Sequence, residues 1–470
     1  MNTAYAYDKS TSSDTPGAAV RRKQLLRRNL RASLGDGMAF GGMVGIGETF
    51  LPAFVLAVGL GELTAGLVAS VPMLAGGIVQ LVAPKAIQLT GSHKQWVVLA
   101  ASVQAFSFVP LVLAACWGQI SALAVFCVAA VYWGAGLATG PAWNTWIEGI
   151  VPRRVRPRYF AVRTRASQAA VCAGFLLGGV SLQAAAGGDY LLWAFAGLFA
   201  AAGVCRLASV WMLSRQSESP HTAATLIEPM TWRENMREMA TGSSGRLLLY
   251  LVAVQGAVQM AGPYFTPFML KQLHFTYFQY VSLISAAFVA KVMMLPFCGH
   301  AAHRLGARRL LWIGGVGIVP LSASWLVSQD FYWLVTVQIL GGAAWASYEL
   351  AFFLLFFESI PAPRRTSVLT LYNLLNTAAF MGGALVGGWM LSTTGASFHG
   401  YLLIFGISSV GRLAALGLLA TTVTRSVPAA GMAFRTLAVR PNSAALDAPV
   451  LPSLPDQLEP AGTPPAVHAT

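Results

Sequence analysis

Long apolar segments alternate with short polar ones over most of the chain. Six such segments precede residue 214 and six follow residue 245, at approximately 33–58, 62–88, 95–116, 119–150, 166–187 and 189–213, then at 246–270, 276–300, 308–328, 331–357, 366–392 and 398–422. A helix needs roughly 20 apolar residues to cross a hydrocarbon core of about 30 Å, and each segment is long enough. The pattern predicts an all-α integral membrane protein with twelve transmembrane helices in two six-helix bundles, 33–213 and 246–427.

Three polar stretches lie outside the predicted bundles. Residues 1–32 form a leader that becomes strongly basic, and residues 214–245 form a charged linker between the bundles. Residues 428–470 hold eight prolines and few aromatic residues, which is typical of a disordered tail. The first apolar run begins only after Arg31 and exceeds the core of a signal peptide, so we expect the first transmembrane helix to direct insertion.

Composition and charge agree with a membrane protein. Of 470 residues, 56% are hydrophobic and 10% are charged, against about 25% charged in soluble domains. The net charge of +14 comes from short basic clusters between apolar segments, a distribution that does not favour nucleic acid. With both termini cytoplasmic, the positive-inside rule is met by every lysine and arginine except Lys271 and Lys291. We therefore expect a multi-pass protein of the cell inner membrane, in contact with the lipid bilayer.

The two halves repeat one design. Residues 47–52 (GETFLP) match residues 262–267 (GPYFTP) at an offset of 215 (262 − 47), and Gly91 matches Gly306 at the same offset. Glu148, before a proline and an arginine-rich turn, matches Glu358 at an offset of 210 (358 − 148). Similar offsets within two series of six segments predict duplicated, pseudo-symmetric halves of the same orientation.

One loop carries a family motif. Residues 299–309 (GHAAHRLGARR) lie between the eighth and ninth segments. This sequence resembles the loop signature of the major facilitator superfamily (MFS), a glycine-bearing turn followed by basic residues, with histidine at the usual aspartate position. The motif residues, which we assign to a cytoplasmic gate, are Gly299, His303, Arg304, Gly306, Arg308 and Arg309.

The resemblance covers roughly residues 30–425 and implies the MFS fold. Proteins of this superfamily are secondary transporters whose halves rock about a central site, and spans 1, 4, 7 and 10 usually line the cavity. The glycine runs of spans 1 and 11 have no neighbouring strand or Walker lysine, so we interpret them as helix-packing positions and expect no nucleotide site. We expect no cofactor and no metal, because the five cysteines lie in or beside apolar segments without a CxxC pair.

Three ionisable residues lie deep in predicted spans and are candidates for ion coupling: Glu48, Glu349 and Lys291. Such groups are costly in a membrane and mark a pathway or a pair. Glu48 or Glu349 could carry a coupling proton. Lys291 and Glu349 could instead form a fixed ion pair between spans 8 and 10.

A second group of polar and aromatic residues is assigned to the solute cavity. These candidates are Gln255, Gln259, Trp143, Asn144, Trp345, Tyr348 and Asn373. The two glutamines share one helix face and could bond a solute or a neighbouring helix. The tryptophans could form an aromatic wall or an interfacial belt. Glu148 and Glu358 join the gate residues, on the hypothesis that Glu358 pairs with the 304–309 loop in one conformer.

These features predict a secondary active transporter that moves a small organic solute, coupled to a proton or another cation, and acts as a monomer. A drug or metabolite efflux antiporter is the alternative within this class. A non-transporting membrane sensor on the same fold is the alternative outside it. An enzyme is disfavoured, because His93, His300 and His303 lie in loops without partners at catalytic spacing.

Overall fold

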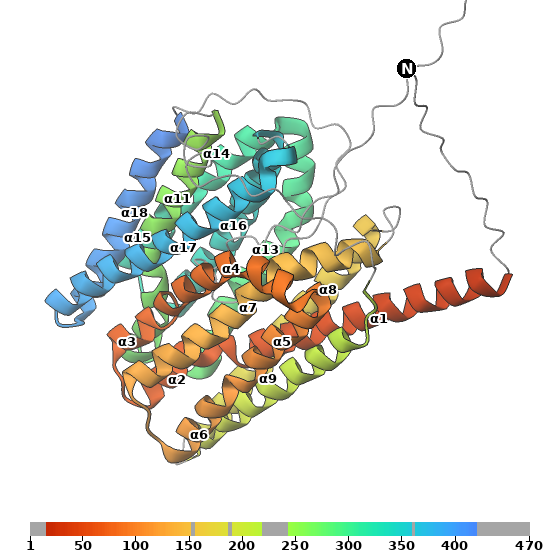
Figure 1. Ribbon diagram of the computed structural model, residues 1–470. Coiled ribbons are helices and arrows are strands. Elements are labelled where there is room, and N and C mark those ends of the chain that lie inside the picture. Colours follow the sequence, from red (N-terminus) through yellow and green to blue (C-terminus); the bar gives the residue numbers. More distant parts are fainter. Residues whose placement is uncertain (1–15, 152–155, 187–189, 219–242, 360–361, 421–470) are drawn as a thin grey trace, which may run out of the picture.

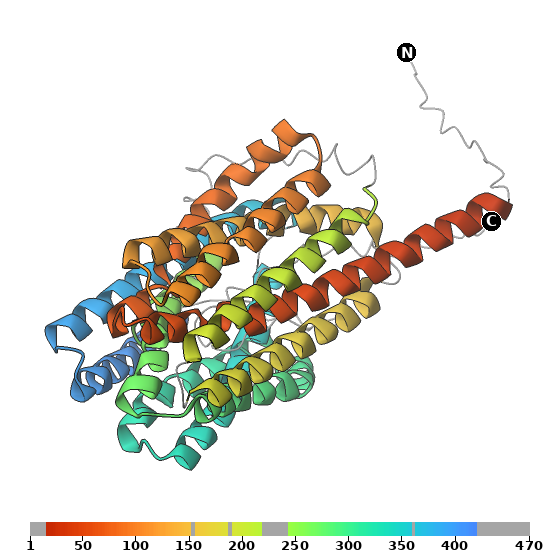
Figure 2. The same cartoon turned by 90° about the horizontal axis from the view of Figure 1, so that it is seen from below.

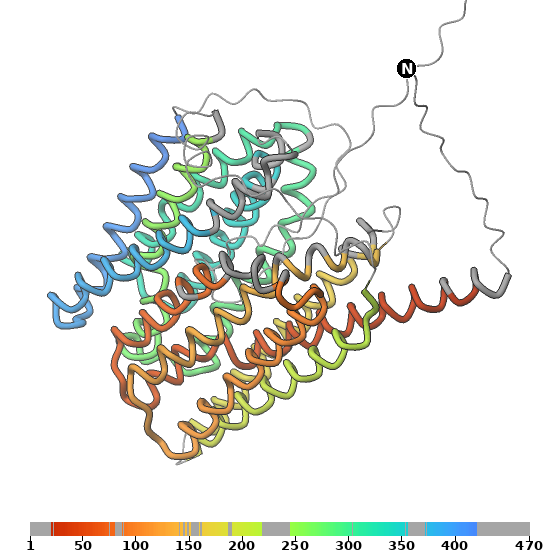
Figure 3. Tube along the Cα trace, in the orientation of Figure 1, coloured from red at the N-terminus to blue at the C-terminus, as the bar shows by residue number. Residues whose placement is uncertain are grey.

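The computed structural model describes residues 16–151, 156–186, 190–218, 243–359 and 362–420, which are helical almost throughout (Figure 1, Figure 3). The N-terminal half contains α1 (Pro16–Ile46), η1 (Glu48–Phe50), α2 (Leu51–Ala57), α3 (Glu62–Leu67), α4 (Val71–Thr90), α5 (His93–Phe106), α6 (Phe108–Trp117), α7 (Ala122–Ile150), α8 (Arg156–Ala185) and α9 (Leu191–Ser214). The predicted tail and most of the predicted linker lie outside the described residues.

The C-terminal half repeats this order. It contains α11 (Ser243–Ala261), η4 (Gly262–Tyr264), α12 (Phe265–Pro267), η5 (Phe268–Gln272), α13 (Tyr277–Leu305), α14 (Ala307–Ile318), α15 (Pro320–Val327), α16 (Phe331–Ser359), α17 (Ala362–Thr393) and α18 (Phe398–Ala420). Interrupted helices combine into single spans, such as α1 with α2, α3 with α4, and α11 through η5. Within the described residues, eleven stretches are long and apolar enough to cross a membrane, and α16 completes the predicted twelve.

The two halves form separate groups of helices, red to yellow-green and green to blue in Figure 1. The two halves are joined mainly by α4 with α17 and by α8 with α13, and α3 also contacts α17 and α12. The α8–α13 contact depends on a small residue. A methyl group on Gly179 of α8 would lie 2.4 Å from Cγ2 of Val281 on α13. Glycine at this point allows the two halves to approach closely.

Polar contacts close one end of the molecule. Gln272 donates from Nε2 to Glu62 Oε1 at 3.3 Å and to the carbonyl oxygen of Ala396 at 3.0 Å. Tyr401 donates a short hydrogen bond to Glu62, and the backbone N–H of Phe278 donates to Gln183 at 3.1 Å. We call this end the closed face and the other end, where α1 begins, the basic face. The structure is thus a conformer whose halves are joined at the closed face.

Helix α1 extends past the other helices at the basic face (Figure 1, Figure 2). Its outer part is fixed to the rest of the half by hydrogen bonds at Asn29 and Leu30. Asn29 donates to the Ser217 hydroxyl at 2.6 Å, and Trp146 donates its indole N–H to the Ser217 carbonyl at 3.0 Å. Tyr159 donates to the carbonyl of Leu30 at 3.0 Å. Burial raises the pKa of this phenol, so Tyr159 stays a neutral donor at physiological pH.

Candidate functional site

Three helix interruptions meet around one cavity. Span 1 breaks at η1, span 2 breaks between α3 and α4, and span 7 breaks at η4. Prolines explain part of this geometry, because Pro72 and Pro263 have no N–H to donate within a helix. At membrane depth, irregular backbone is tolerated only where it is buried in protein or lines a cavity. The interruptions therefore mark the place where a solute site is expected.

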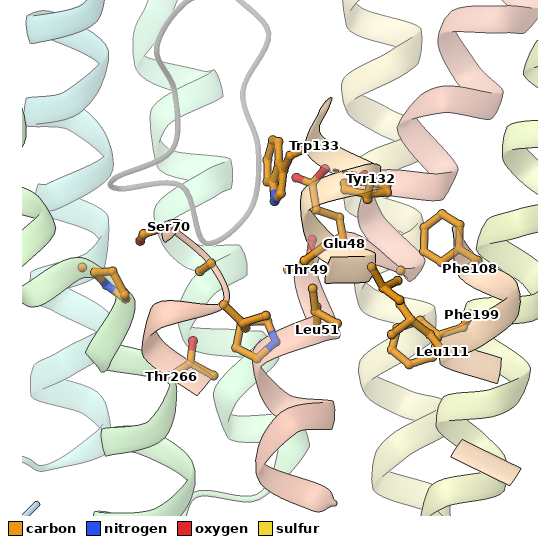
Figure 4. Close-up of a pocket in the computed structure, with 18 of the residues that line it drawn as sticks. Glu48, Thr49, Leu51, Ser70, Phe108, Leu111, Tyr132, Trp133, Phe199 and Thr266 are labelled. Atoms are coloured by element: carbon orange, nitrogen blue, oxygen red, sulfur yellow. Dashed lines mark hydrogen bonds between the residues drawn. The ribbon is translucent and has the colours of Figure 1, made fainter. Parts of the chain in front are cut away.

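The cavity is lined mainly by the N-terminal half, with span 7 as its other wall (Figure 4). Its polar side chains are Glu48, Thr49, Ser70, Tyr132, Gln259 and Thr266. Aromatic and aliphatic side chains complete the wall, and they include Leu51, Phe108, Leu111, Trp133 and Phe199. A largely apolar pocket with a few convergent polar groups is the usual form of a small-molecule site.

Glu48 is the acidic residue of this lining. Its Oε2 accepts a hydrogen bond of 2.5 Å from the Tyr132 hydroxyl on α7, and Figure 4 shows the two side chains directed toward each other. The Tyr132 ring packs edge-on against Phe108 and Trp133, with ring centroids 5.5 and 5.6 Å away. These contacts hold the phenol in place, so the carboxylate has a fixed donor at the cavity wall.

The other two ion-coupling candidates form an ion pair away from this cavity. Lys291 Nζ on α13 lies 2.7 Å from Glu349 Oε1 on α16, and each residue is 6% exposed. Gly342 allows the helices to approach, since a methyl group there would lie 2.3 Å from the Ala287 carbonyl oxygen. The pair joins spans 8 and 10 inside the C-terminal half.

The cavity candidates separate into two groups. Gln259 lines the cavity, whereas Gln255, one turn earlier on α11, is buried and does not. Trp345 and Tyr348 pack against each other in the core of the C-terminal half, with ring centroids 5.6 Å apart. Trp143 stacks under the guanidinium of Arg163, 4.3 Å from its ring centroid. In this conformer, spans 1, 4 and 7 line the cavity as expected, and the described residues of span 10 do not.

Part of the predicted gate is described. Gly306 ends α13 with a φ of +83°, a conformation that favours glycine, and this explains the glycine of the motif at the turn. Gly299 is buried within α13, Arg308 is partly buried, and Arg304 and Arg309 are exposed at the basic face. The side chains of His303, Glu148, Glu358, Asn144 and Asn373 lie outside the described part of the structure.

A buried polar cluster at the basic face was not predicted. Asp36 of α1 accepts from Arg163 of α8 at 2.8 Å and from the Ser209 hydroxyl of α9 at 2.7 Å. Ser209 in turn accepts from Arg206 at 2.8 Å. Asp36 lies within a predicted span, so the rule that selected Glu48 selects it too. The cluster joins spans 1, 5 and 6 of the N-terminal half.

Two membrane-spanning bundles joined at one face, with a polar cavity at three helix interruptions, form an arrangement that is typical of membrane solute transporters. The model of the Major Facilitator Superfamily matches residues 247–452, in the C-terminal half. Comparison with curated proteins finds no match.

Solved structures extend the likeness to both halves. A mutant of the nucleoside transporter NupG aligns with a TM-score of 0.62 at 13% identity, over 84% of this chain and 99% of NupG. A D-xylose–proton symporter aligns with a TM-score of 0.58 at 17% identity, over 86% of this chain and 98% of the symporter. A bacterial homologue of the human lysosomal transporter Spinster, in an inward-facing conformation, aligns with a TM-score of 0.58 at 12% identity, over 85% and 95% of the two chains. The Major Facilitator Superfamily match therefore covers the half that carries the predicted loop motif, and the solved structures show a similar fold over both halves.

Proposed function

We propose that the protein is a proton-coupled secondary transporter that moves a small organic solute by alternating access. The observation that carries the proposal is the Glu48 carboxylate, which lines the cavity at a helix interruption and accepts from Tyr132. Ionisable groups at this depth are costly and mark ion or substrate pathways. In the proposal, Glu48 binds the coupling proton and Gln259 contacts the solute from span 7.

The coupling follows from the cost of a charge in a closed cavity. A charged carboxylate is poorly solvated when the cavity is sealed from water, and the protonated form avoids that cost. Protonation of Glu48 therefore favours closure around the solute, and opening to water on the other side favours release of the proton. A proton gradient then drives net solute movement.

The charge pattern supports an orientation for this cycle. Arg304 and Arg309 are exposed at the basic face, and the positive-inside rule assigns such residues to the cytoplasm. We place the basic face and both termini in the cytoplasm of a cell with an inner membrane, so that the closed face points outward. A monomer suffices for this cycle, because both cavity walls come from one chain.

The test uses proteoliposomes with an imposed proton gradient. Uptake is measured for uridine and D-xylose, chosen because structural neighbours include nucleoside and D-xylose transporters, and for succinate and tetraphenylphosphonium. The variant Glu48→Gln should lose gradient-driven accumulation but keep solute exchange, since it carries no exchangeable carboxyl proton. Asp330→Asn is the matched control, because Asp330 caps α16 far from the cavity and asparagine can replace it as a cap. Accumulation by Glu48→Gln at the wild-type level would refute the role of Glu48.

The same experiment separates the alternatives. Under an inward proton gradient, the proposed symporter accumulates solute inside the liposome, whereas an efflux antiporter would expel it. The antiporter would accumulate solute only under an outward proton gradient. A sensor would move no solute under either gradient.

A further inference from the structure

Ser70 occupies a position where a serine side chain normally caps a helix, yet its hydroxyl makes no such bond. It is the N-cap of α4, and an N-cap hydroxyl usually accepts from the N–H of the second or third helical residue. The second residue is Pro72, which has no N–H. The third, Met73, donates to the backbone carbonyl of Ser70 at 3.2 Å. The local sequence therefore leaves the Ser70 hydroxyl available for another partner.

The Ser70 hydroxyl is buried at the wall of the cavity. Ser70 is 0% exposed, and its Oγ has no hydrogen-bond partner among the described residues. It lines the cavity, on the opposite side from Glu48 in the view of Figure 4. Buried hydroxyl groups are nearly always hydrogen-bonded, and leaving one unpaired is unfavourable. A solute in the cavity would supply the missing partner.

The surroundings of Ser70 favour an electron-rich solute atom. The N-terminus of a helix carries partial positive charge, and α4 extends for 20 residues from this point. Glu48 has the opposite character and favours a hydrogen-bond donor such as a hydroxyl or an ammonium group. The cavity lining holds no lysine, arginine or histidine within the described part of the chain, so a solute with net negative charge would have no counter-ion there.

We infer that Ser70 is a substrate-binding residue that donates its hydroxyl to an acceptor oxygen of the solute, while Glu48 accepts from a donor group of the same molecule. The solute class is a small hydroxylated or amine-bearing compound without net negative charge, whose apolar face lies against Phe108, Leu111 and Phe199. This inference rests on the proposed transport function but not on proton coupling.

The test measures binding to the purified full-length protein in detergent, without a gradient. Dissociation constants are determined by calorimetry for uridine and D-xylose, with succinate as the anion and tetraphenylphosphonium as a cation without hydrogen-bonding groups. The variants are Ser70→Ala, Ser70→Thr, which keeps the hydroxyl, and Ser181→Ala. The Ser181 hydroxyl donates to its own helix at 2.8 Å on an exposed face, so this variant is the matched control.

We expect uridine or D-xylose to bind the wild-type protein and to lose about 3- to 10-fold in affinity with Ser70→Ala, the effect of one neutral hydrogen bond. Ser70→Thr should lose less, and Ser181→Ala should bind as the wild type does. Equal affinity of the wild type and Ser70→Ala for a bound neutral probe would overturn the role of Ser70. Binding of succinate alone, or of none of the neutral probes, would overturn the solute class. These outcomes leave the proton-coupling test of Glu48 unaffected.

A measurement without ligand adds an independent check. Because Ser70 Oγ has no protein partner among the described residues, Ser70→Ala should unfold at the wild-type temperature or above it. A marked fall in the melting temperature would mean that the hydroxyl has a structural partner, and the inference would then fail.

Discussion

Removing one partner of the Lys291–Glu349 pair should destabilise the C-terminal half more than removing both. The two charges are 2.7 Å apart and lie between α13 and α16, with each residue 6% exposed. Glu349→Gln keeps the shape of the side chain but leaves the Lys291 ammonium without its carboxylate partner. Lys291→Met combined with Glu349→Leu replaces both charges by apolar groups of similar volume.

The magnitudes follow from the cost of a buried charge. Breaking a buried ion pair on one side typically costs about 3–5 kcal/mol, whereas replacing the whole pair by apolar residues is often neutral or stabilising. We therefore expect Glu349→Gln to lower the free energy of unfolding by about 3–5 kcal/mol and the double variant to stay within about 1 kcal/mol of the wild type. The strongly non-additive result is the signature of two residues that act as one unit.

Unfolding in mixed detergent micelles, followed by tryptophan fluorescence and circular dichroism, measures these differences. Lys291→Met alone completes the double-mutant cycle. If the double variant is destabilised by the sum of the two single effects, the pair is not a coupled unit and the reasoning is refuted. Transport by the stable double variant then decides between the two hypotheses for Glu349. Normal proton-driven accumulation supports a fixed pair, and loss of accumulation with normal stability makes Glu349 a coupling residue.

Two further predictions concern contacts at opposite ends of the molecule. Asp36→Asn removes the charge that accepts from Arg163 at 2.8 Å and should cost about 1.5–3 kcal/mol of stability. Thermal unfolding of the single variants and of the double variant with Arg163→Gln measures this, and additive losses would contradict it. Glu62→Gln weakens the contacts with Gln272 and should open the closed face more often. A cysteine replacing Ala396 should then react about tenfold faster with an impermeant maleimide, and an unchanged rate would exclude a closing role for Glu62.

Hydropathy and the internal repeat were sufficient to predict the fold. The twelve spans follow from segment length alone, because a membrane imposes one helix length on every crossing. The match of residues 47–52 with 262–267 reflects a shared backbone feature. In the structure both segments contain a short 3-10 turn, Glu48–Phe50 and Gly262–Tyr264, and both turns border the cavity.

The side-chain partners could not be predicted in the same way. Glu48 and Tyr132 are 84 positions apart, and hydropathy gives neither the rotation of a helix nor its depth relative to a neighbour. Ser70 looks like an ordinary helix cap in the sequence, and only its burial at the cavity distinguishes it. Asp36 is a different case, because it lies within a predicted span and meets the rule for embedded charges, yet it was not predicted.

The breaks in spans 1 and 7 share a short 3-10 turn but differ in chemistry. At the offset of 215, Glu48 corresponds to Pro263 and Thr49 corresponds to Tyr264. The C-terminal half therefore supplies no acidic group at its own break, and the described cavity has a single carboxylate, on the N-terminal side. In the proposed proton-coupled cycle, this asymmetry leaves Glu48 as the one carboxylate of the described cavity that can bind the proton.

Tyr264 connects the cavity to the closed face. It follows the cavity residue Pro263 directly, is 0% exposed, and donates to the Ala384 carbonyl on α17 at 2.7 Å. A methyl group on Gly66 of α3 would lie 2.3 Å from its ring, and one on Gly387 of α17 would lie 2.9 Å from it. The ring thus fills a space between α3 and α17 that exists only because both helices carry glycine there. In the proposed cycle, opening the closed face would separate these helices and remove the packing of the ring. A movement of the span 7 break caused by a bound solute would then act on a contact that holds the two halves together.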